Sequence, residues 1–180
     1  MSHRHNSLRF NALLSGLIGT LLLMTAAIAQ SSPLQTVDTP LLATAEQVLG
    51  DPNAPVEVIE YASLTCHHCA SFHNEVLPQV KKELVDTGKI RIVFRDFPLD
   101  RSAFQAAILT RCVAPNRYFP LVSMLFAKQD DWSHAKDPLE ALSRYGALAG
   151  LPKESFQACL ADKALGDSIL QSRMDGERKY

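Results

Sequence analysis

The sequence lacks an excess of charge of either sign. Its 180 residues carry 18 Lys and Arg against 19 Asp and Glu, a formal net charge of −1 with neutral histidines. Nucleic-acid-binding domains usually carry a basic patch or stripe, and the few adjacent basic residues here are typical of solvated helix faces. The composition therefore gives no indication of a nucleic-acid partner.

Long apolar runs are scarce, and the one clear example lies at the N-terminus. Residues 12–26 form an apolar core that follows two arginines, and residues 27–29 (Ala-Ile-Ala) match the small-x-small pattern of a cleavage site. We therefore expect residues 1–29 to be an export signal that is cleaved after Ala29, with an uncleaved membrane anchor as the alternative. No other segment of the sequence is long and apolar enough to cross a bilayer.

Cysteines are few, and a second closely spaced pair is absent. Cys66 and Cys69 form the single Cys-x-x-Cys, while the other two cysteines stand alone. Structural zinc sites usually combine two such pairs, so zinc would require nearby histidines in a cramped geometry. Attachment of a c-type haem requires a histidine directly after the second cysteine, where this chain has Ala70. The pattern favours redox chemistry without a metal or cofactor, and zinc binding is the alternative.

The Cys-x-x-Cys lies at the junction between a predicted strand and a predicted helix. An apolar, β-branched run over residues 56–61 ends at a turn over 63–65, and apolar residues then recur at i, i+4 spacing from Phe72 to Leu84. The first turn of a helix carries unpaired N–H groups and the positive end of the helix dipole, which stabilise a nearby anion. A thiol held there ionises more readily, and the thiolate is the attacking species in disulfide exchange.

These positions indicate different roles for the two cysteines. Cys66, at the start of the helix, is the candidate attacking thiol, and Cys69, one turn later, is the candidate resolving thiol. His67 and His68 lie between them and supply hydrogen-bond donors and, when protonated, positive charge. An even number of cysteines in an exported chain also fits an oxidising compartment. The expected chemistry is thiol–disulfide exchange.

The remaining pattern predicts one more strand and a series of helices. Residues 89–97 form the second strand, which together with the strand over 56–61 and the helix between them predicts a right-handed βαβ unit with parallel strands. We expect that helix to end near Asp86 with an interruption at Pro78, and a short helix over residues 43–49. Five later helices are expected over residues 102–112, 117–128, 138–149, 152–161 and 164–177.

Three segments of the sequence resemble the exported disulfide oxidoreductases of the DsbA type. They read GDPNAPVEVIEYASLTCHHCASFH, GKIRIVFRDFPLD and FQACLAD, and the similarity extends from Leu49 to the end of the chain. The resemblance implies an α/β, thioredoxin-like fold with an inserted helical domain. It divides the chain into a signal peptide (1–29), an N-terminal leader (30–48), a βαβ unit with the cysteine pair (49–100) and the helical domain (101–180).

The resemblance also assigns roles around the cysteine pair. Cys66 matches the family's exposed nucleophile and Cys69 its buried partner, which together form the redox-active disulfide. His68 matches the histidine that stabilises the thiolate in the best-known members. His67 stands where the family usually has a proline, so a second imidazole is expected to alter the stability of the thiolate.

Glu60 is the acidic residue that the resemblance places beneath the cysteines. It matches a buried carboxyl group of the family, and burial disfavours the charged form of a carboxyl. Such a group can relay a proton to or from Cys69. The alternative is an ion pair between Glu60 and Arg95 with no role in turnover.

Cys112 and Cys159 lie on separate predicted helices. Some members of the family carry a second disulfide in this region, so the resemblance implies a Cys112–Cys159 bond, with two buried free thiols as the alternative. Such a bond closes a loop of about 48 residues and stabilises the fold by about 4 kcal/mol in the loop-entropy treatment.

One part of the family's pattern has no match in this sequence. Members of the family continue, after the helical domain, with the second half of the sheet, which begins with a strand preceded by a cis-proline. None of the later prolines has that context, and the sequence reaches Tyr180 about where the segment would begin. We therefore expect a C-terminally truncated, incomplete sheet whose exposed edge invites aggregation.

The resemblance completes the functional prediction. It implies a periplasmic enzyme that introduces disulfides into exported proteins with reduced cysteines, and a membrane partner that reoxidises the enzyme. Because Cys-x-x-Cys chemistry runs in either direction according to redox potential, a disulfide isomerase or reductase of the same fold is one alternative. A non-catalytic exported binding protein, in which the cysteine pair is a relic, is the other.

Overall fold

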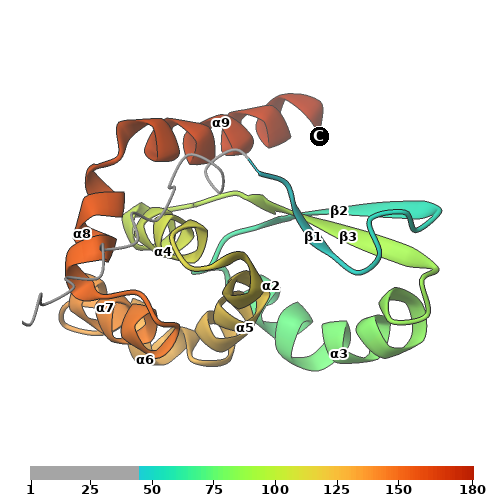
Figure 1. Ribbon diagram of the computed structural model, residues 1–180, viewed down its shortest axis with the longest axis horizontal. Coiled ribbons are helices and arrows are strands. Elements are labelled where there is room, and N and C mark those ends of the chain that lie inside the picture. The colour runs from blue at the N-terminus through green and yellow to red at the C-terminus, as the bar shows by residue number, and fades with distance from the viewer. Residues whose placement is uncertain (1–44) are drawn as a thin grey trace, which may run out of the picture. The chain divides into compact units, whose positions relative to one another are not determined.

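The computed structural model describes residues 45–180. The expected signal peptide, its cleavage after Ala29 and most of the expected leader lie outside these residues. The described residues form a three-stranded sheet with helices on both of its faces (Figure 1). None of their helices combines the length and the apolar character that a membrane span requires.

The parallel pair expected from the strand–helix–strand pattern forms the centre of the fold. Strand β2 (Val56–Ala62) pairs in parallel with strand β3 (Ile90–Asp96), and Glu60 lies opposite Phe94 in this register. Their valines and isoleucines fit a pleated, half-buried surface. Ile92 belongs to a small apolar cluster with the helix that follows β2. Ile92, Val93 and Phe94 are all buried, so both faces of β3 are covered at the centre of the sheet.

The third strand corrects an expectation from the sequence. A short helix was predicted over residues 43–49, but Gln47–Leu49 is strand β1, which pairs antiparallel with β3. The sheet order is therefore β1-β3-β2, and the expected leader contributes its last residues to the sheet. The three residues of β1 are too few to show the alternation of a strand in the sequence. They pair with β3 because its free edge carries backbone N–H and C=O groups that need hydrogen-bond partners.

The helical stretch that follows the cysteine turn is continuous but not uniformly α-helical. It consists of α2 (His67–Ser71), a π-helical turn η1 (Phe72–Val76), α3 (Leu77–Val80) and a second π-helical turn η2 (Lys81–Val85). The sequence predicted a helix to about this point, interrupted at Pro78. Proline has no N–H to donate to the preceding turn, and η1 lies directly before the turn that contains it. Single π-turns inside helices are frequent at functional sites.

All five later helices are present, with ends within two residues of those predicted. They are α4 (Arg101–Arg111), α5 (Tyr118–Ala127), α7 (Pro138–Leu148), α8 (Lys153–Ala161) and α9 (Lys163–Lys179). Two short elements were not expected, the 3-10 turn η3 (Pro115–Arg117) and helix α6 (Gln129–Ser133). Helix α6 places the side chain of Trp132, which is fully buried, in the main core.

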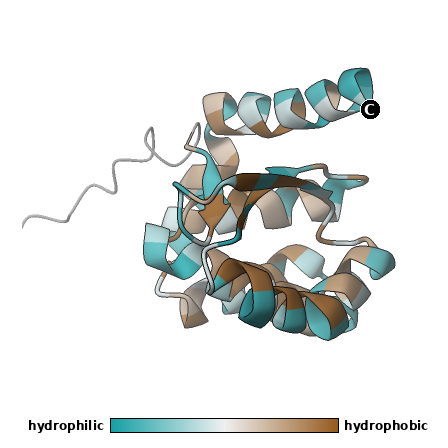
Figure 2. Ribbon diagram, turned by 90° about the vertical axis from the view of Figure 1, so that its right-hand side faces the viewer, coloured by the Kyte–Doolittle hydropathy of each residue, from teal (hydrophilic) through white to brown (hydrophobic). Residues whose placement is uncertain are grey.

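Helices pack against both faces of the sheet. Helix α9 lies over one face, and the stretch from α2 to η2 lies over the other (Figure 1). The side of these helices that is turned toward the sheet is mainly apolar and the outward side mainly polar (Figure 2), with Val76, Leu170 and Met174 as exposed exceptions. Such amphipathic packing buries one stripe of each helix. The cysteine-bearing helix therefore rests on the sheet through its apolar stripe.

Two links tie helix α4 to its surroundings. Arg111 near its end forms an ion pair with Asp96 of β3, with Nε 2.7 Å from the carboxylate oxygen, and both side chains are buried. Burial raises the pKa of Asp96, and the Arg111 charge opposes that rise. Directly after α4, Cys112 forms a disulfide with Cys159 of α8, with Cα atoms 6.4 Å apart. The ion pair therefore holds α4 to the sheet, and the disulfide holds the end of α4 to α8.

Candidate functional site

Cys66 begins the helix that carries the cysteine pair. It is the N-cap residue of α2 and has an extended backbone conformation. Its Sγ accepts a hydrogen bond from the backbone N–H of Cys69, at 3.4 Å. The sulfur therefore satisfies one of the N–H groups that a helix leaves unpaired at its start, at the positive end of the helix dipole.

The turn before Cys66 is held by hydroxyl groups and by the next helix. The Ser63 hydroxyl accepts from the backbone N–H groups of Thr65 and Leu99, both at 3.4 Å. The Thr65 hydroxyl donates to Asp100 at 2.5 Å. Asp100 also caps α4, because its other carboxylate oxygen accepts from the N–H of Ala103 at 2.8 Å. The start of α2 and the start of α4 are thus fixed to each other.

Gln129 of α6 supports the same turn from the helical part of the chain. Its buried amide nitrogen donates to the carbonyl oxygens of Leu64, at 2.8 Å, and Cys66, at 3.1 Å. These contacts join residues more than 60 positions apart. Sequence reasoning did not identify Gln129, because a single glutamine in a short helix carries no pattern that points to a distant backbone.

Cys69 lies one helical turn after Cys66 and is half-buried. Burial, a hydrogen bond with Cys66 and the negative charge of Glu60 raise the pKa of its thiol to about 12, and burial is the largest cause. The thiol of Cys69 therefore remains protonated at neutral pH. Both cysteines are free, and each is partly exposed.

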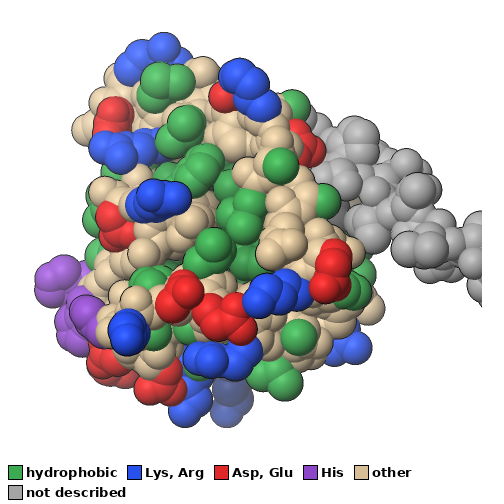
Figure 3. Space-filling view, turned by 90° about the vertical axis from the view of Figure 1, so that its left-hand side faces the viewer, with side chains coloured by type: hydrophobic (Ala, Val, Ile, Leu, Met, Phe, Trp, Pro, Cys, Tyr) green, Lys and Arg blue, Asp and Glu red, His purple; other side chains and the backbone are tan. Residues whose placement is uncertain are grey.

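The two histidines between the cysteines are exposed. Their rings approach with centroids 6.2 Å apart. His68 borders the groove that also contains Cys69, whereas His67 borders a separate cleft of about 280 Å³ between α2, α5 and α6. Figure 3 shows one face of the molecule, with exposed histidine side chains at its left edge next to acidic side chains.

Glu60 lies beneath the cysteine helix, but its ion-pair partner is not the one considered from the sequence. Its Oε1 is 2.8 Å from Nε2 of His73, whereas Arg95 pairs with Glu46. The alternative Glu60–Arg95 pair is therefore wrong. His73, which received no role from the sequence, is buried. The sequence could have indicated that His73 lies near the cysteine pair, because it is four residues after Cys69 and residues at i and i+4 share a helix face.

A shallow groove brings Glu60 and the cysteine helix together. It has a volume of about 430 Å³ and runs between β2 and the start of α2. Its walls are mainly apolar, with one carboxyl group, one thiol and one imidazole among them. The groove is lined by Val58, Ile59, Glu60, Tyr61, His68, Cys69 and Phe72.

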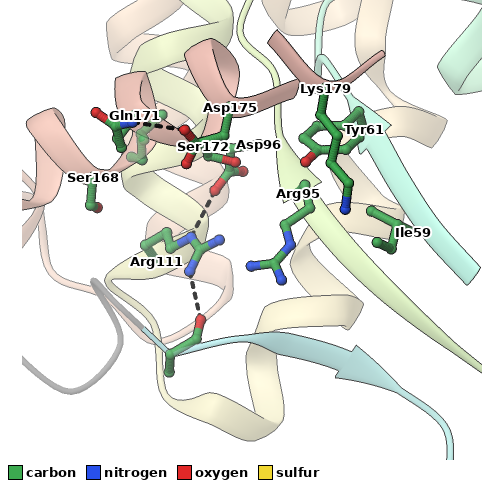
Figure 4. Close-up of a pocket in the computed structure, with 12 residues that line it drawn as sticks. Ile59, Tyr61, Arg95, Asp96, Arg111, Ser168, Gln171, Ser172, Asp175 and Lys179 are labelled. Carbon is green, nitrogen blue, oxygen red and sulfur yellow. Dashed lines mark hydrogen bonds and ion pairs between the residues drawn. The ribbon is translucent and has the colours of Figure 1, made fainter. Parts of the chain in front are cut away.

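A larger cavity lies between the sheet and α9. It measures about 460 Å³, and neither a cysteine nor a histidine lines it. The Asp96–Arg111 ion pair is part of its wall, and Arg111 also reaches the carbonyl oxygen of Ala45 (Figure 4). This cavity is separate from the thiol site.

The described residues provide no cluster of metal ligands. Within residues 45–180, no group of three or more His, Cys, Asp or Glu side chains gathers as a metal site requires. The chemistry open to the site is that of two neighbouring thiols with different environments, a carboxyl group and nearby imidazoles.

The chain is similar to known proteins in both sequence and structure. Residues 43–179 match the family described as Thioredoxin. The crystal structure of alpha-DsbA1 from Wolbachia pipientis is similar, with a TM-score of 0.70 and 38% identity, over 76% of this chain and 69% of that one. A protein-disulfide isomerase from Novosphingobium aromaticivorans is similar with a TM-score of 0.66 and 25% identity, over 75% and 81% of the two chains.

Curated relatives agree with these structures. A protein assigned as a protein-disulfide oxidoreductase in Rickettsia prowazekii is 35% identical over 131 residues, which is 72% of this chain and 48% of that protein. The chain spans about half the length of the curated relatives it matches. The expected α/β, thioredoxin-like fold is confirmed.

Proposed function

Since the chain belongs to the thioredoxin family and is similar to its DsbA-like members, we propose that it is a thiol–disulfide oxidoreductase. Cys66 and Cys69 are its redox pair. The observation that carries this proposal is the position of Cys66, whose sulfur caps helix α2, while Cys69 lies one turn later and burial raises the pKa of its thiol. This arrangement separates an attacking sulfur from a resolving one.

The exchange follows from these two positions. In the oxidised protein, a thiolate of the partner protein attacks Sγ of Cys66, the Cys66–Cys69 bond breaks, and Cys69 leaves and takes up a proton. A second thiolate of the partner then attacks the partner's own sulfur in the mixed disulfide and expels Cys66 as a thiolate. The partner loses two electrons and gains a disulfide, and the cysteine pair is reduced.

The geometry favours the oxidising direction. The N–H of Cys69 and the dipole of α2 favour an anionic sulfur at Cys66, and stabilising the reduced form makes a cysteine pair a stronger oxidant. We propose that the partners are exported proteins with reduced cysteines, and that the chain acts in the periplasm. A membrane protein that accepts the electrons would then restore the Cys66–Cys69 disulfide.

A glutathione redox titration tests this proposal. The chain is equilibrated over a range of glutathione ratios, trapped with a thiol reagent and analysed by intact mass. We expect a single two-thiol step close to the oxidising value of about −120 mV for DsbA. A step near about −270 mV, the value of thioredoxin, would indicate a reductase instead.

The matched control removes the second cysteine pair. A Cys112→Ala/Cys159→Ala variant should retain the two-thiol step, because the redox pair is Cys66 and Cys69. Cys66→Ser should abolish it. Absence of any two-thiol step in the unmodified chain would overturn the proposal and favour a non-catalytic binding protein.

A further inference from the structure

A buried histidine near the cysteine pair has no part in the exchange steps described above. His73 is 8% exposed, and it lies in η1, four residues after Cys69. Its Nε2 is 2.8 Å from Oε1 of Glu60. Because an ionised carboxylate only accepts hydrogen bonds, the ring nitrogen is the donor in this contact. His73 therefore holds one oxygen of the Glu60 carboxylate.

Aromatic rings fix the orientation of the His73 ring. It stacks on Phe126 of α5, with centroids 4.2 Å apart and a tilt of 32°. Phe72 and Phe94 meet it edge-on, at 5.8 Å and 6.1 Å. Its Nδ1 is buried and has no hydrogen-bond partner within residues 45–180. Among the described residues, the hydrogen bond from Nε2 to Glu60 is therefore the polar contact of the His73 ring, and the surrounding aromatic rings hold the ring in the orientation that makes it.

Glu60 connects His73 with the resolving thiol. Its side chain lines the same groove as Cys69, and its charge acts on the Cys69 sulfur. The thiol of Cys69 must lose its proton before it can attack a disulfide. Among the described residues, Glu60 is the one carboxyl group that lines this groove with Cys69, which makes it the candidate acceptor for this proton.

We propose that His73 is a positioning residue of thiol–disulfide exchange, which holds the Glu60 carboxylate as the base for the Cys69 thiol. The inference rests on the proposed function of the cysteine pair. When Cys69 attacks Sγ of Cys66 in a mixed disulfide, its proton passes to Glu60, the Cys66–Cys69 bond forms, and the partner sulfur leaves as a thiolate. In the reverse step, the Glu60 carboxyl group returns the proton to the departing Cys69.

Other titratable groups surround this pair without replacing it. His68 borders the groove from α2. Tyr118 of α5 has a pKa raised well above its usual value, mainly by burial, and also senses the charge of Glu60. Behind it, Asp96 and Arg111 are paired with each other. His73 is therefore the titratable side chain in direct contact with Glu60 among the described residues.

The test follows the reaction of the reduced chain with oxidised glutathione. Cys66 first forms a mixed disulfide with glutathione, and Cys69 then displaces it. Acid-quenched samples analysed by intact mass give the rates of both steps. We expect His73→Leu and Glu60→Gln to slow the second step on the order of a hundredfold, the low end of what a general base contributes, while the first step changes little.

Further variants separate positioning from a structural effect. His73→Gln keeps a donor for the carboxylate and should restore part of the rate, and adding His73→Leu to Glu60→Gln should cause no further loss. In the slowed variants the second step should increase with pH more steeply than in the unmodified chain, because hydroxide must then remove the proton. His134→Gln, at an exposed histidine of the chain, serves as the matched control with both rates unchanged.

Equal second-step rates in the His73 variants and the unmodified chain would overturn the inference. So would an equal loss from His73→Leu in the presence and absence of the Glu60 carboxyl group. If His73→Leu does not fold, His73→Gln with and without Glu60→Gln gives the same comparison. Failure of the unmodified chain to form the Cys66–Cys69 disulfide would instead refute the proposed function.

Discussion

At the scale of single residues, the two cysteines are distinguished by their places on one helix. Cys66 caps α2 and accepts an N–H group, whereas Cys69 lies against the groove wall with a pKa raised to about 12. The sulfur that we propose as the attacking one is therefore at the start of the helix. The resolving sulfur needs a proton acceptor nearby, and Glu60 lines the same groove.

The raised pKa predicts a pH profile for Cys69. In a Cys66→Ser variant, we expect Cys69 to be alkylated slowly at neutral pH and increasingly fast as the pH rises toward 12, because a raised pKa keeps the thiol protonated. Burial is the largest cause and remains when Cys66 is replaced. Iodoacetamide alkylation followed by mass spectrometry measures this profile. A profile centred near 9.0, the ordinary value, would contradict it.

Gln129 should influence the cysteines through the backbone. Replacing it by leucine removes both hydrogen bonds to the turn before α2, and an unpaired buried carbonyl group costs about 1–3 kcal/mol. We expect a loss of stability in that range and roughly tenfold slower exchange at Cys66, because small misplacements of a reacting group lower rates strongly. Urea unfolding and the first step of the glutathione reaction measure the two effects.

Gln157→Leu is the matched control for this prediction, because Gln157 is exposed on α8. Its stability and exchange rate should match those of the unmodified chain. Equal behaviour of the two glutamine variants would show that the contacts of Gln129 do not support the site.

At the scale of elements, close approaches decide how helices lie on the sheet. Helix α9 crosses the sheet near Tyr61, and Gly176 is the residue that allows it. A Cβ atom at this position would lie 2.7 Å from the Tyr61 ring and 3.2 Å from the Phe97 ring. The glycine is therefore required by space, although glycine lowers the stability of a helix interior.

Gly176→Ala should loosen the docking of α9. The substitution gains about 1 kcal/mol of helix propensity but introduces overpacking that costs about 1–3 kcal/mol, so we expect a net loss of stability. Gly166→Ala in the same helix is the control, since its Cβ would approach no closer than 3.3 Å to the tip of the Phe104 ring. Thermal unfolding of both variants and of the unmodified chain measures the effect. A midpoint for Gly176→Ala equal to or higher than that of the unmodified chain would contradict the expectation.

At the scale of the whole described structure, one long-range link joins the sheet to the helical part and another joins two helices within that part. One is the buried Asp96–Arg111 ion pair, and the other is the Cys112–Cys159 disulfide between the end of α4 and α8. A disulfide stabilises mainly by restricting the unfolded chain, and the effect grows with the length of the closed loop. This bond joins residues 47 positions apart.

Removal of that disulfide should lower stability and leave the redox pair in place. For Cys112→Ala/Cys159→Ala we expect a loss of about 4 kcal/mol at most in the free energy of unfolding, as the loop-entropy treatment gives. Urea unfolding under oxidising conditions measures it. A variant as stable as the unmodified chain would show that the packing around α4 and α8 alone holds these helices.

The sequence by itself determined the features whose residues are neighbours along the chain. The spacing of Cys66 and Cys69 and the change from a strand pattern to a helical one placed the thiol site, because the start of a helix is a local feature. The five later helices followed from their own periodicity. The βαβ unit followed from the order of its elements and from the fixed handedness of such crossovers.

Only the tertiary structure decided the contacts between residues distant in sequence. Strand β1 exists because the edge of β3 receives it, and three residues alone carry no period that could show this. The amide of Gln129 meets the carbonyl of Cys66, and the ring of His73 turns to Glu60 on a neighbouring strand. Each contact depends on how one element packs against another, and that packing is a property of the folded chain.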